Sequence, residues 1–374
     1  MLRLVVSVVL GLHGLIHLAG AAKGFGLVTL PALTTPIGRG LGVLWLVAGL
    51  AVLAAAIALA LGAPSAWAFA LGAAALSQLA IASAWTDARW GTLANVLLLG
   101  GAFVAAFADG PFGLHARYRA RLAEAEAQVA HAPQGPPLDA AAIAHLPPPV
   151  QRYLQVSGAV GRPRPLGFRA TMRGGLRGAA DADWMPFDAE QVNLFDPPRR
   201  TFFMVARRAG IPAHGLHVYD PDVASMEVRL AALAPIVAQS GPTLTRAETV
   251  TVLDDMSIFA PGALVTPAIR WRAIDDTHAE AALTIGAYTV TATLAFDAGG
   301  LLVDLWSDDR PALSADGARF EPQRWSTPIT GYAPQGPLFL PSRGEARYAP
   351  PSGPYTYITF ERIQTTALEG GAGR

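Results

Sequence analysis

Two histidines in the first apolar segment of the chain have the types and spacing most suggestive of chemistry. His13 and His17 are four residues apart, so a helix would place both side chains on one face. Polar side chains in lipid cost free energy unless they face other helices and find partners there. Gln78 and Asn95 occupy later apolar segments, at depths that match His17 if neighbouring segments run antiparallel. The sequence therefore predicts one polar cluster of these four residues.

Three interpretations of this polar cluster remain open. The simplest is a set of interhelical hydrogen bonds, worth about 0.6 kcal/mol each, that fix the packing of the helices. The second is a binding site for a small molecule of quinone type. The third is a metal or haem site, which is disfavoured because the two histidines have no carboxylate ligand nearby in the sequence. We expect no bound metal and no other cofactor.

A second candidate site combines aromatic and basic residues in the C-terminal half of the chain. Trp271, Trp306 and Trp325 lie in strand-like segments, and Arg270 adjoins the first of them. Small-molecule pockets are typically apolar with a few polar anchors. In a sheet that is open on one side, the tryptophans would line a groove for an apolar ligand and Arg270 would hold an anionic head. Core packing and surface ion pairs are the alternative for the same residues.

Two further groups of residues are weaker candidates. Asp254 and Asp255 are adjacent in a predicted helix, where neighbouring side chains point about 100° apart and do not act on one atom. We expect both on a solvated helix face. His214 and His217 could join a nearby aspartate such as Asp220 in a metal site. An ordinary hairpin end is the expected alternative.

The motifs of familiar enzyme classes are absent from the sequence. It has no glycine-rich phosphate loop, no Gly-x-Ser-x-Gly elbow and no His-Glu-x-x-His helix. It also has no cysteine, which excludes disulfides, thiolate nucleophiles and cysteine-ligated metals. The net charge of zero disfavours a nucleic-acid partner. These absences favour a protein that is not an enzyme of a familiar class.

The distribution of charge divides the chain into two unlike parts. The sequence has 28 basic and 28 acidic residues, and only six of them lie before position 111. A membrane-spanning helix needs roughly 20 mostly apolar residues, and four stretches of this part suit such helices, at 4–22, 41–61, 67–85 and 93–108. Short links between them predict an up-down bundle. We predict a four-helix transmembrane domain over 1–110, a helical, proline-rich linker over 111–137 and a soluble domain over 138–374.

The basic residues near the ends of the apolar stretches predict the orientation in the membrane. Four of them lie on one side of the bundle and three on the other. The four are Arg3, Arg117, Arg119 and Arg121. Because cytoplasmic loops carry the excess of basic residues, we expect both termini and the soluble domain in the cytoplasm, beside the inner membrane of a bacterium. Arg119 and Arg121 would then face the lipid headgroups of the bilayer.

The soluble part is expected to be rich in strands. Asp139 caps a predicted short helix, and a second short helix follows three prolines at 147–149. After Pro165, strand-like segments alternate with Gly, Pro and Asp clusters, and one helix over 243–259 interrupts them. The predicted strands are 166–173, 187–194, 201–207, 215–219, 225–230, 268–274, 280–285, 288–296, 301–308, 323–332, 342–348 and 355–365. The fold class is α+β, with a curved, half-open, barrel-like antiparallel sheet and one covering helix.

Several separated motifs in the soluble part resemble a widespread, uncharacterised family of bacterial membrane-attached proteins. The motifs are Leu-Pro-Pro-Pro-Val-Gln-Arg-Tyr-Leu at 146–154, Trp-Met-Pro-Phe at 184–187 and Asp-Pro-Pro at 196–198. The resemblance extends over roughly 146–365. That family has no established activity, so it implies no catalytic residue. Its expected shape is similar to the half-open sheet of lipoprotein carriers, which hold lipid chains in their concave face.

The apolar part resembles small four-helix membrane proteins of the DoxX-like type. The resemblance lies in the segment from His13 to His17 and in Trp-Thr-Asp-Ala-Arg-Trp-Gly-Thr-Leu-Ala-Asn at 85–95. Some members of that group are associated with quinone redox work, so the resemblance implies a similar role here.

Three functions are consistent with these observations. The leading hypothesis is a membrane-anchored protein whose sheet domain binds a hydrophobic or amphiphilic ligand such as a lipid. The second is a membrane oxidoreductase or quinone-interacting subunit that uses His17, Gln78 and Asn95. The third is a scaffold subunit without a ligand, which an exposed sheet edge would favour.

Overall fold

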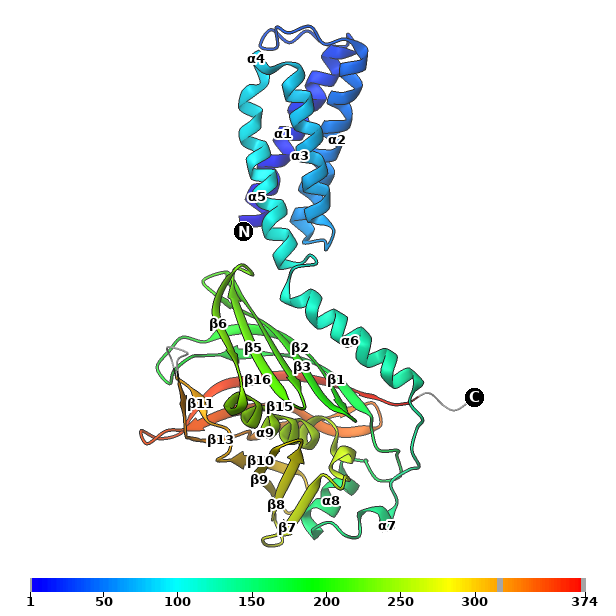
Figure 1. Ribbon diagram of the computed structural model, residues 1–374, viewed down its shortest axis with the longest axis vertical. Coiled ribbons are helices and arrows are strands. Elements are labelled where there is room, and N and C mark those ends of the chain that lie inside the picture. Colours follow the sequence, from blue (N-terminus) through cyan, green and yellow to red (C-terminus); the bar gives the residue numbers. More distant parts are fainter. Residues whose placement is uncertain (1, 315–318, 371–374) are drawn as a thin grey trace. The chain divides into compact units, whose positions relative to one another are not determined.

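The chain consists of two compact units in a computed structural model that describes residues 2–314 and 319–370. The units are Met1–Arg117 and Tyr118–Arg374. The first is helical and the second is built on a large sheet (Figure 1). Four N-terminal apolar helices followed by an antiparallel sheet domain with a helix confirm the predicted fold class.

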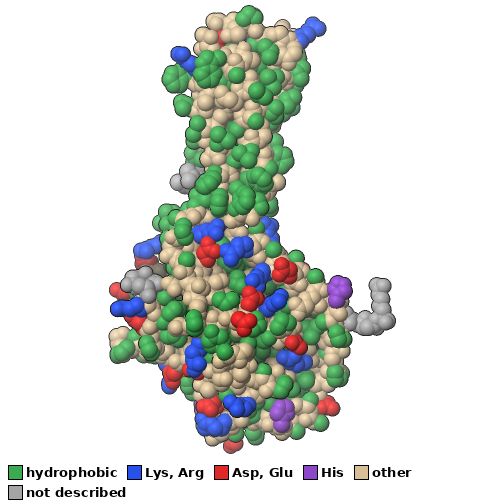
Figure 2. Space-filling view, in the orientation of Figure 1, with side chains coloured by type: hydrophobic (Ala, Val, Ile, Leu, Met, Phe, Trp, Pro, Cys, Tyr) green, Lys and Arg blue, Asp and Glu red, His purple; other side chains and the backbone are tan. Residues whose placement is uncertain are grey.

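The helices of the first unit follow from its long apolar stretches. They are α1 (Leu2–Gly24), α2 (Arg39–Leu61), α3 (Ala66–Ser83), α4 (Trp85–Ala88), η1 (Arg89–Gly91) and α5 (Thr92–Ala108). Among the described residues, four helical stretches are long and apolar enough to cross a membrane, Leu4–Gly24, Arg39–Leu61, Ala66–Ser83 and Trp85–Ala108. Apolar side chains cover the visible face of this unit, where charges are few (Figure 2).

Small residues let the first two helices approach closely. A Cβ atom added to Gly24 would lie 2.6 Å from the Cα atom of Gly42. Helix α1 therefore packs against α2 through backbone atoms, a mode of packing typical of helices in membranes.

In the described part of the second unit, three helices precede the sheet, the first of them beginning just before the unit boundary, and one helix lies within it. They are α6 (Leu114–His131), α7 (Ala140–Ile143), α8 (Pro148–Val156) and α9 (Pro242–Phe259), with the short helix η2 (Pro261–Leu264) after α9. The strands are β1 (Gly167–Leu176), β2 (Met185–Phe195), β3 (Pro198–Arg208), β4 (Ile211–Asp220), β5 (Val223–Leu230), β6 (Ala234–Ser240), β7 (Ile269–Ala273), β8 (His278–Ile285), β9 (Tyr288–Phe296), β10 (Leu302–Ser307), β11 (Ala312–Leu313), β12 (Phe320–Glu321), β13 (Arg324–Ser326), β14 (Ile329–Gln335), β15 (Leu338–Ala349) and β16 (Tyr355–Leu368).

The main sheet is antiparallel and curved but not closed. Its order in the described chain is β6-β5-β4-β3-β2-β1-β16-β15-β13-β10-β9-β8-β7, with β14 paired to β15. Strands β6 and β7 end this order with a strand partner on one side only, so each leaves a free edge among the described residues. Each predicted strand coincides with an observed one, except that 323–332 is split between β13 and β14 where Pro328 interrupts it. Strand β6, which contains Pro235, and the two-residue strands β11 and β12 were not predicted.

Helix α9 lies inside the curve of the sheet, and nearly all of its side chains are buried (Figure 1). Phe259 stacks on Phe168 of β1, with 4.7 Å between the ring centroids. Helix α8 closes one end of this core, because the Tyr153 hydroxyl donates to the Ser257 carbonyl at 2.6 Å. The sheet therefore surrounds the helix instead of only supporting it.

Helix α6 packs on the convex face of the sheet. Tyr118 is buried and stacks on Phe203 of β3. Arg121 donates two hydrogen bonds of 2.9 Å to the carboxylate of Asp220 on β4. The expectation that Arg121 faces lipid headgroups is therefore wrong, because a carboxylate of the sheet domain holds its guanidinium. A charge count along the sequence does not show that pairing.

Replacing Arg121 with alanine is expected to loosen α6 from the sheet. Both side chains of the Arg121–Asp220 pair are about one-third exposed, so the pair contributes at most about 1 kcal/mol. Faster hydrogen exchange at the α6 amides from Tyr118 onward would report this loss. The exposed Arg208 provides a matched control, and equal exchange in R121A and R208A would contradict the prediction.

Candidate functional site

The structure brings two of the four residues of the predicted polar cluster, His13 and His17, together around a serine. Nε2 of His13 and Nε2 of His17 lie 3.0 Å and 2.8 Å from the Ser77 hydroxyl oxygen, and all three residues are buried. The two imidazole rings are 4.7 Å apart. A hydroxyl has one proton to donate, so Ser77 donates to one imidazole at most and accepts from the other. Ser77 was missed, although a serine beside Gln78 in an Ala-rich and Leu-rich helix is itself a polar signal.

Gln78 and Asn95 form a second group of hydrogen bonds in the same unit. Asn95 donates to the Gln78 side-chain oxygen at 2.8 Å, and Gln78 donates to the Thr92 hydroxyl at 3.3 Å. Two buried atoms, Nδ1 of His17 and Oδ1 of Asn95, have no hydrogen-bond partner in the described chain. Buried polar atoms are rarely left without a partner, so these two mark where a ligand or water would add one.

Replacing Ser77 with alanine is expected to destabilise the helical unit by about 0.6–2 kcal/mol, the range measured for hydrogen bonds between membrane helices. The substitution removes the hydroxyl that both histidines share. Thermal unfolding of the full chain in detergent, followed by far-ultraviolet circular dichroism, would measure the loss. Ser65 is exposed and its side chain caps no helix, so S65A should match the unchanged chain. Equal melting of S77A and S65A would refute the prediction.

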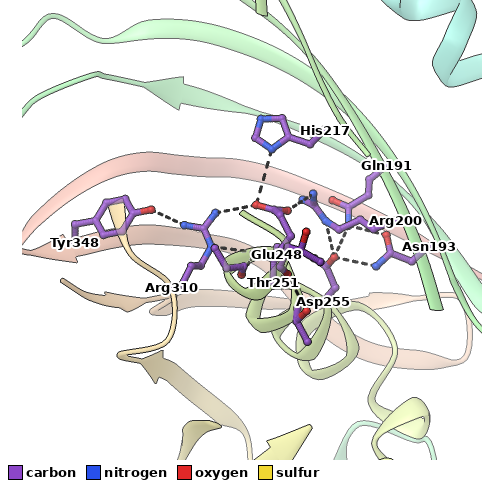
Figure 3. Close-up of polar contacts among 12 residues, drawn as sticks. Gln191, Asn193, Arg200, His217, Glu248, Thr251, Asp255, Arg310 and Tyr348 are labelled. Atoms are coloured by element: carbon purple, nitrogen blue, oxygen red, sulfur yellow. Dashed lines mark hydrogen bonds and ion pairs between the residues drawn. The ribbon is translucent and has the colours of Figure 1, made fainter. Parts of the chain in front are cut away.

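The sheet domain contains a buried network of charges centred on α9 (Figure 3). Glu248 accepts hydrogen bonds from Arg200 of β3 at 3.0 Å and from Arg310, which follows β10, at 3.5 Å. Asp255, two turns further along α9, accepts from Nε of Arg200 at 2.8 Å. One helix is therefore bound by arginines from two distant parts of the sheet.

One carboxylate oxygen of Asp255 accepts hydrogen bonds from three side chains. Gln191 and Asn193 of β2 each donate to its Oδ2 atom at 2.8 Å, in addition to Arg200. Burial raises the pKa of Asp255, and these three donors oppose that shift by stabilising the charged form. An oxygen that accepts three hydrogen bonds is best explained by an ionised carboxylate.

Asp254 has a different environment from its neighbour. Its Oδ1 atom accepts one hydrogen bond of 2.6 Å from the Thr327 hydroxyl. Burial raises the pKa of Asp254 well above its ordinary value, because the hydrogen bond from Thr327 and the charge of Arg310 offset the lost solvation only in part and the charge of Asp255 adds to the shift. The side chains are also not solvated, since Asp254 and Asp255 are only 5% and 3% exposed. The expectation of a solvated helix face is therefore wrong, because the sheet curls around α9.

Arg310 is enclosed by aromatic rings. Its guanidinium lies 4.4 Å from the ring centroid of Trp325 and donates to the Tyr348 hydroxyl at 2.5 Å. Trp325 in turn donates to the Tyr357 hydroxyl at 3.0 Å. Arg310 also donates hydrogen bonds to Thr251 and Glu248. Its contact with the Trp325 ring is a cation–π interaction.

His217 of β4 is more accessible than Glu248 and the two arginines of this network. Its Nδ1 atom lies 4.0 Å from Glu248, and its side chain is 25% exposed whereas that of Glu248 is 4% exposed. Burial lowers the pKa of His217 to about 4, in spite of Glu248. The imidazole is therefore neutral at pH 7, with one donor and one acceptor.

The structure does not bring His214 and His217 together. His217 pairs with Phe202 in the register of β3 and β4, whereas His214 contacts Phe203. Since neighbouring residues of a strand point to opposite faces, the two histidines lie on opposite sides of the sheet. Within residues 2–314 and 319–370, no group of three or more His, Asp or Glu side chains is placed to hold a metal ion.

The other predicted ligand residues of the sheet domain are divided between its two faces. Trp325 is buried beside Arg310, and Trp271 packs against the core of the concave side. Trp306 contacts His278 on the outer face, and Arg270 is exposed on that face of β7. The three tryptophans therefore do not line one groove with Arg270.

The geometry of the network defines its chemical capacity. Two arginines face two carboxylates, so the charges nearly cancel and most of the donors are used. Among the ionisable side chains that bond to Glu248, His217 is the most exposed. The arrangement can hold α9 in the sheet and can present one neutral imidazole to a bound molecule.

This fold and site define a helix-filled, half-open antiparallel sheet that follows an apolar helical unit. The chain belongs to a family of unknown function, DUF6544, whose family model matches residues 136–360. A crystal structure of a LolA superfamily protein from Nitrosomonas europaea is similar at 12% sequence identity and a TM-score of 0.32, covering 57% of this chain and 92% of the other. Comparison with curated proteins finds no match. These comparisons do not confirm the resemblance of the helical unit to DoxX-like proteins.

Proposed function

We propose that this protein is anchored in a membrane by its helical unit and that its sheet domain binds an amphiphilic small molecule such as a lipid. The anchor is supported by the length of the apolar helices and by their outward side chains. Val8, Ile16 and Ile57 are each more than 60% exposed, which is unfavourable in water and favourable in hydrocarbon.

The ligand site is proposed on the concave face of the sheet, beside α9. There, apolar side chains that continue the core are only partly buried. They are Leu176 of β1, Met185 of β2, Met226 of β5, and Ile358 and Phe360 of β16. Leu176 lies between Met185 and Ile358 in the strand register. An aliphatic chain would remove this apolar surface from water, and this observation carries the proposal.

The polar end of the ligand is expected to be uncharged. Met226 pairs with His217 in the register of β4 and β5, so the apolar surface meets the accessible imidazole. A neutral imidazole matches a hydroxyl or ester group, which also has donors or acceptors without charge. Arg270, the residue first expected to hold an anionic head, lies on the other face. We therefore favour a neutral head over an anionic one.

Photo-crosslinking tests this proposal with a defined probe. The full chain would be reconstituted in nanodiscs with a diacylglycerol that carries a diazirine on one acyl chain, and crosslinked peptides would be mapped by mass spectrometry. We expect crosslinks in β1, β2, β5 and β16. M226E should reduce them, whereas S225E should not, because Ser225 points to the convex face. Crosslinks confined to the apolar helices would refute ligand binding by the sheet.

We place the sheet domain in the cytoplasm of a bacterial cell, because the basic residues that follow α5 favour that side. The chain has no cysteine, so single cysteines report accessibility without background. In intact spheroplasts, a membrane-impermeant maleimide should label L27C, in the exposed loop after α1, but not G178C, in a surface loop of the sheet domain. Labelling of G178C before lysis would reverse the assignment.

A second candidate function is quinone binding or redox work in the helical unit. The unpartnered Nδ1 atom of His17 and Oδ1 atom of Asn95 favour it, because a quinone carbonyl or hydroquinone hydroxyl would supply the missing hydrogen bonds. An absorption spectrum of the purified chain and titration with a short-chain ubiquinone would test it. We expect H17A to weaken binding, and unchanged affinity in H17A would reject this function.

A further inference from the structure

Strand β16 has strand partners on both sides only over the short stretch 358–360. On one side, β1 pairs with residues 358–368 of β16, and the Arg177 N–H donates to the Tyr357 carbonyl just before them. On the other side, β15 pairs with it only from Tyr355 to Phe360, opposite Tyr348 to Gly344. The remaining part of β15 pairs with β14 and leaves the sheet as a hairpin. The sheet therefore forks, and β16 from Glu361 onward has an open edge.

The backbone at this edge is partly satisfied by a side chain. Leu368 directs its carbonyl to β1, so the alternate residues Ile363, Thr365 and Ala367 direct their backbone groups to the open side. The Thr365 N–H donates to the side-chain oxygen of Gln335 in β14, at 2.5 Å. Gln335 thus occupies the place where the carbonyl of a neighbouring strand would accept. Within the described residues, β16 has no strand partner on this side beyond Phe360.

The fork contains a groove of about 850 Å³. Its walls come from β1, β16 and the β14–β15 hairpin, and most of the residues that line it are of polar or charged type. The open edge from Glu361 to Leu368 corresponds to an extended segment of roughly 26 Å. A groove with an unpaired strand edge along one wall has the geometry in which an added peptide strand finds backbone hydrogen bonds.

The charge of the groove indicates the chemistry of its occupant. Its lining includes Arg169, Arg343 and Arg362 but only one acidic residue, Glu361. Arg169 has an exposed ion pair with Glu126 of α6. Arg343 and Arg362 are exposed and form no ion pair in the part of the chain that the structure describes. A segment with acidic side chains would supply the missing partners.

We propose that this groove binds an extended acidic segment of a partner protein, which adds a strand to the open edge of β16. Backbone hydrogen bonds to Ile363, Thr365 and Ala367 provide the pairing, and Gln335 is displaced from Thr365. Side chains that alternate along the added strand face Arg343 and Arg362. This site lies apart from α9 and the concave ligand site. The proposal of peptide binding therefore does not depend on the proposed lipid binding.

A labelled peptide tests the proposal on the full chain in detergent. The probe is a fluorescein-labelled peptide of about eight residues that alternates Glu and Val, a length that matches the open edge. Fluorescence anisotropy should show saturable binding that weakens as salt is added. A Lys-Val peptide of the same pattern should not bind. A Glu-Val peptide with N-methyl groups on alternate amides should also fail, because methylation removes the donors that strand pairing needs.

Protein variants separate the site from general charge attraction. Arg343→Gln and Arg362→Gln should each weaken binding by up to about fivefold, whereas Arg208→Gln, at an exposed arginine of β3, should leave it unchanged. Hydrogen exchange at the amides of 363, 365 and 367 should slow when the peptide is present. The proposal is overturned if the Glu-Val peptide does not bind, or if the Lys-Val or methylated peptide binds equally well. It is also overturned if the three variants have equal effects. Self-association of the chain through the β16 edge, with exclusion of the peptide, would overturn it as well.

Discussion

Replacing Glu248 with glutamine is expected to destabilise the sheet domain by about 3–5 kcal/mol, the cost of removing one partner from a buried group of charges. Glu248 faces Arg200 and Arg310 with a side chain that is only 4% exposed. Glutamine keeps the shape but removes the charge. The two arginines then remain buried with a single compensating carboxylate, that of Asp255.

Urea-induced unfolding of the full chain in mild detergent would measure this cost at pH 7. Proteolysis of the sheet domain at each urea concentration reports the unfolded fraction. Glu280→Gln is the matched control, because Glu280 pairs with Arg272 on the surface and its loss should cost less than about 1 kcal/mol. The Arg200 and Arg310 guanidinium groups hold the pKa of Glu248 below its usual range in spite of burial. The negative charge of Glu248 therefore stabilises the fold at pH values above the pKa of this group in the unfolded chain. This stabilisation is lost as the pH falls through the lower pKa that Glu248 has in the folded protein. Similar costs for E248Q and E280Q at pH 7 would contradict a stabilising role of Glu248 in the buried network.

The same network shows where prediction from the sequence ends. The apolar helices, most of the strands and α9 were predicted because hydropathy, turn residues and proline act over short stretches of chain. The pairing of His13 and His17 was predictable for the same reason, since a spacing of four residues places both on one helix face. Local patterns therefore located the elements and one candidate cluster.

The interior network depends on contacts between residues that are far apart in the chain. Asp255 meets Arg200 of β3, and Glu248 meets Arg310 beyond β10. No spacing rule connects such positions, and the charges of α9 suggest an exposed helix when they are taken alone. Only the curl of the sheet, which surrounds α9, places these charges opposite arginines. A polar helix in a chain of apolar strands therefore indicates a buried charge network only once the strand topology is known.

Adjacent aspartates of α9 should respond in opposite ways to the same substitution. Asp254→Asn is expected to be neutral or stabilising at pH 7, because burial raises the pKa of this carboxyl and so disfavours its charged form, and an asparagine oxygen can accept from Thr327 as well. Asp255→Asn is expected to cost about 2–3 kcal/mol or more, because it leaves Arg200 without one of its two carboxylate partners. The two variants control for each other, since they lie in one helix and change the same atoms.

The pH dependence of stability distinguishes the protonated Asp254 from an ionised one. A carboxyl whose folded pKa is raised binds its proton more tightly in the native state, so stability falls as pH rises from about 4 to the folded pKa. D254N has no such proton, and its stability relative to the unchanged chain should therefore increase over that interval. Asp304, whose pKa burial raises to about 6, remains in both proteins and cancels in the comparison. A stability difference between D254N and the unchanged chain that is constant from pH 4 to pH 8 would mean that Asp254 is ionised in the folded protein. The pKa of Asp254 would then not be raised by burial beside α9's other charges.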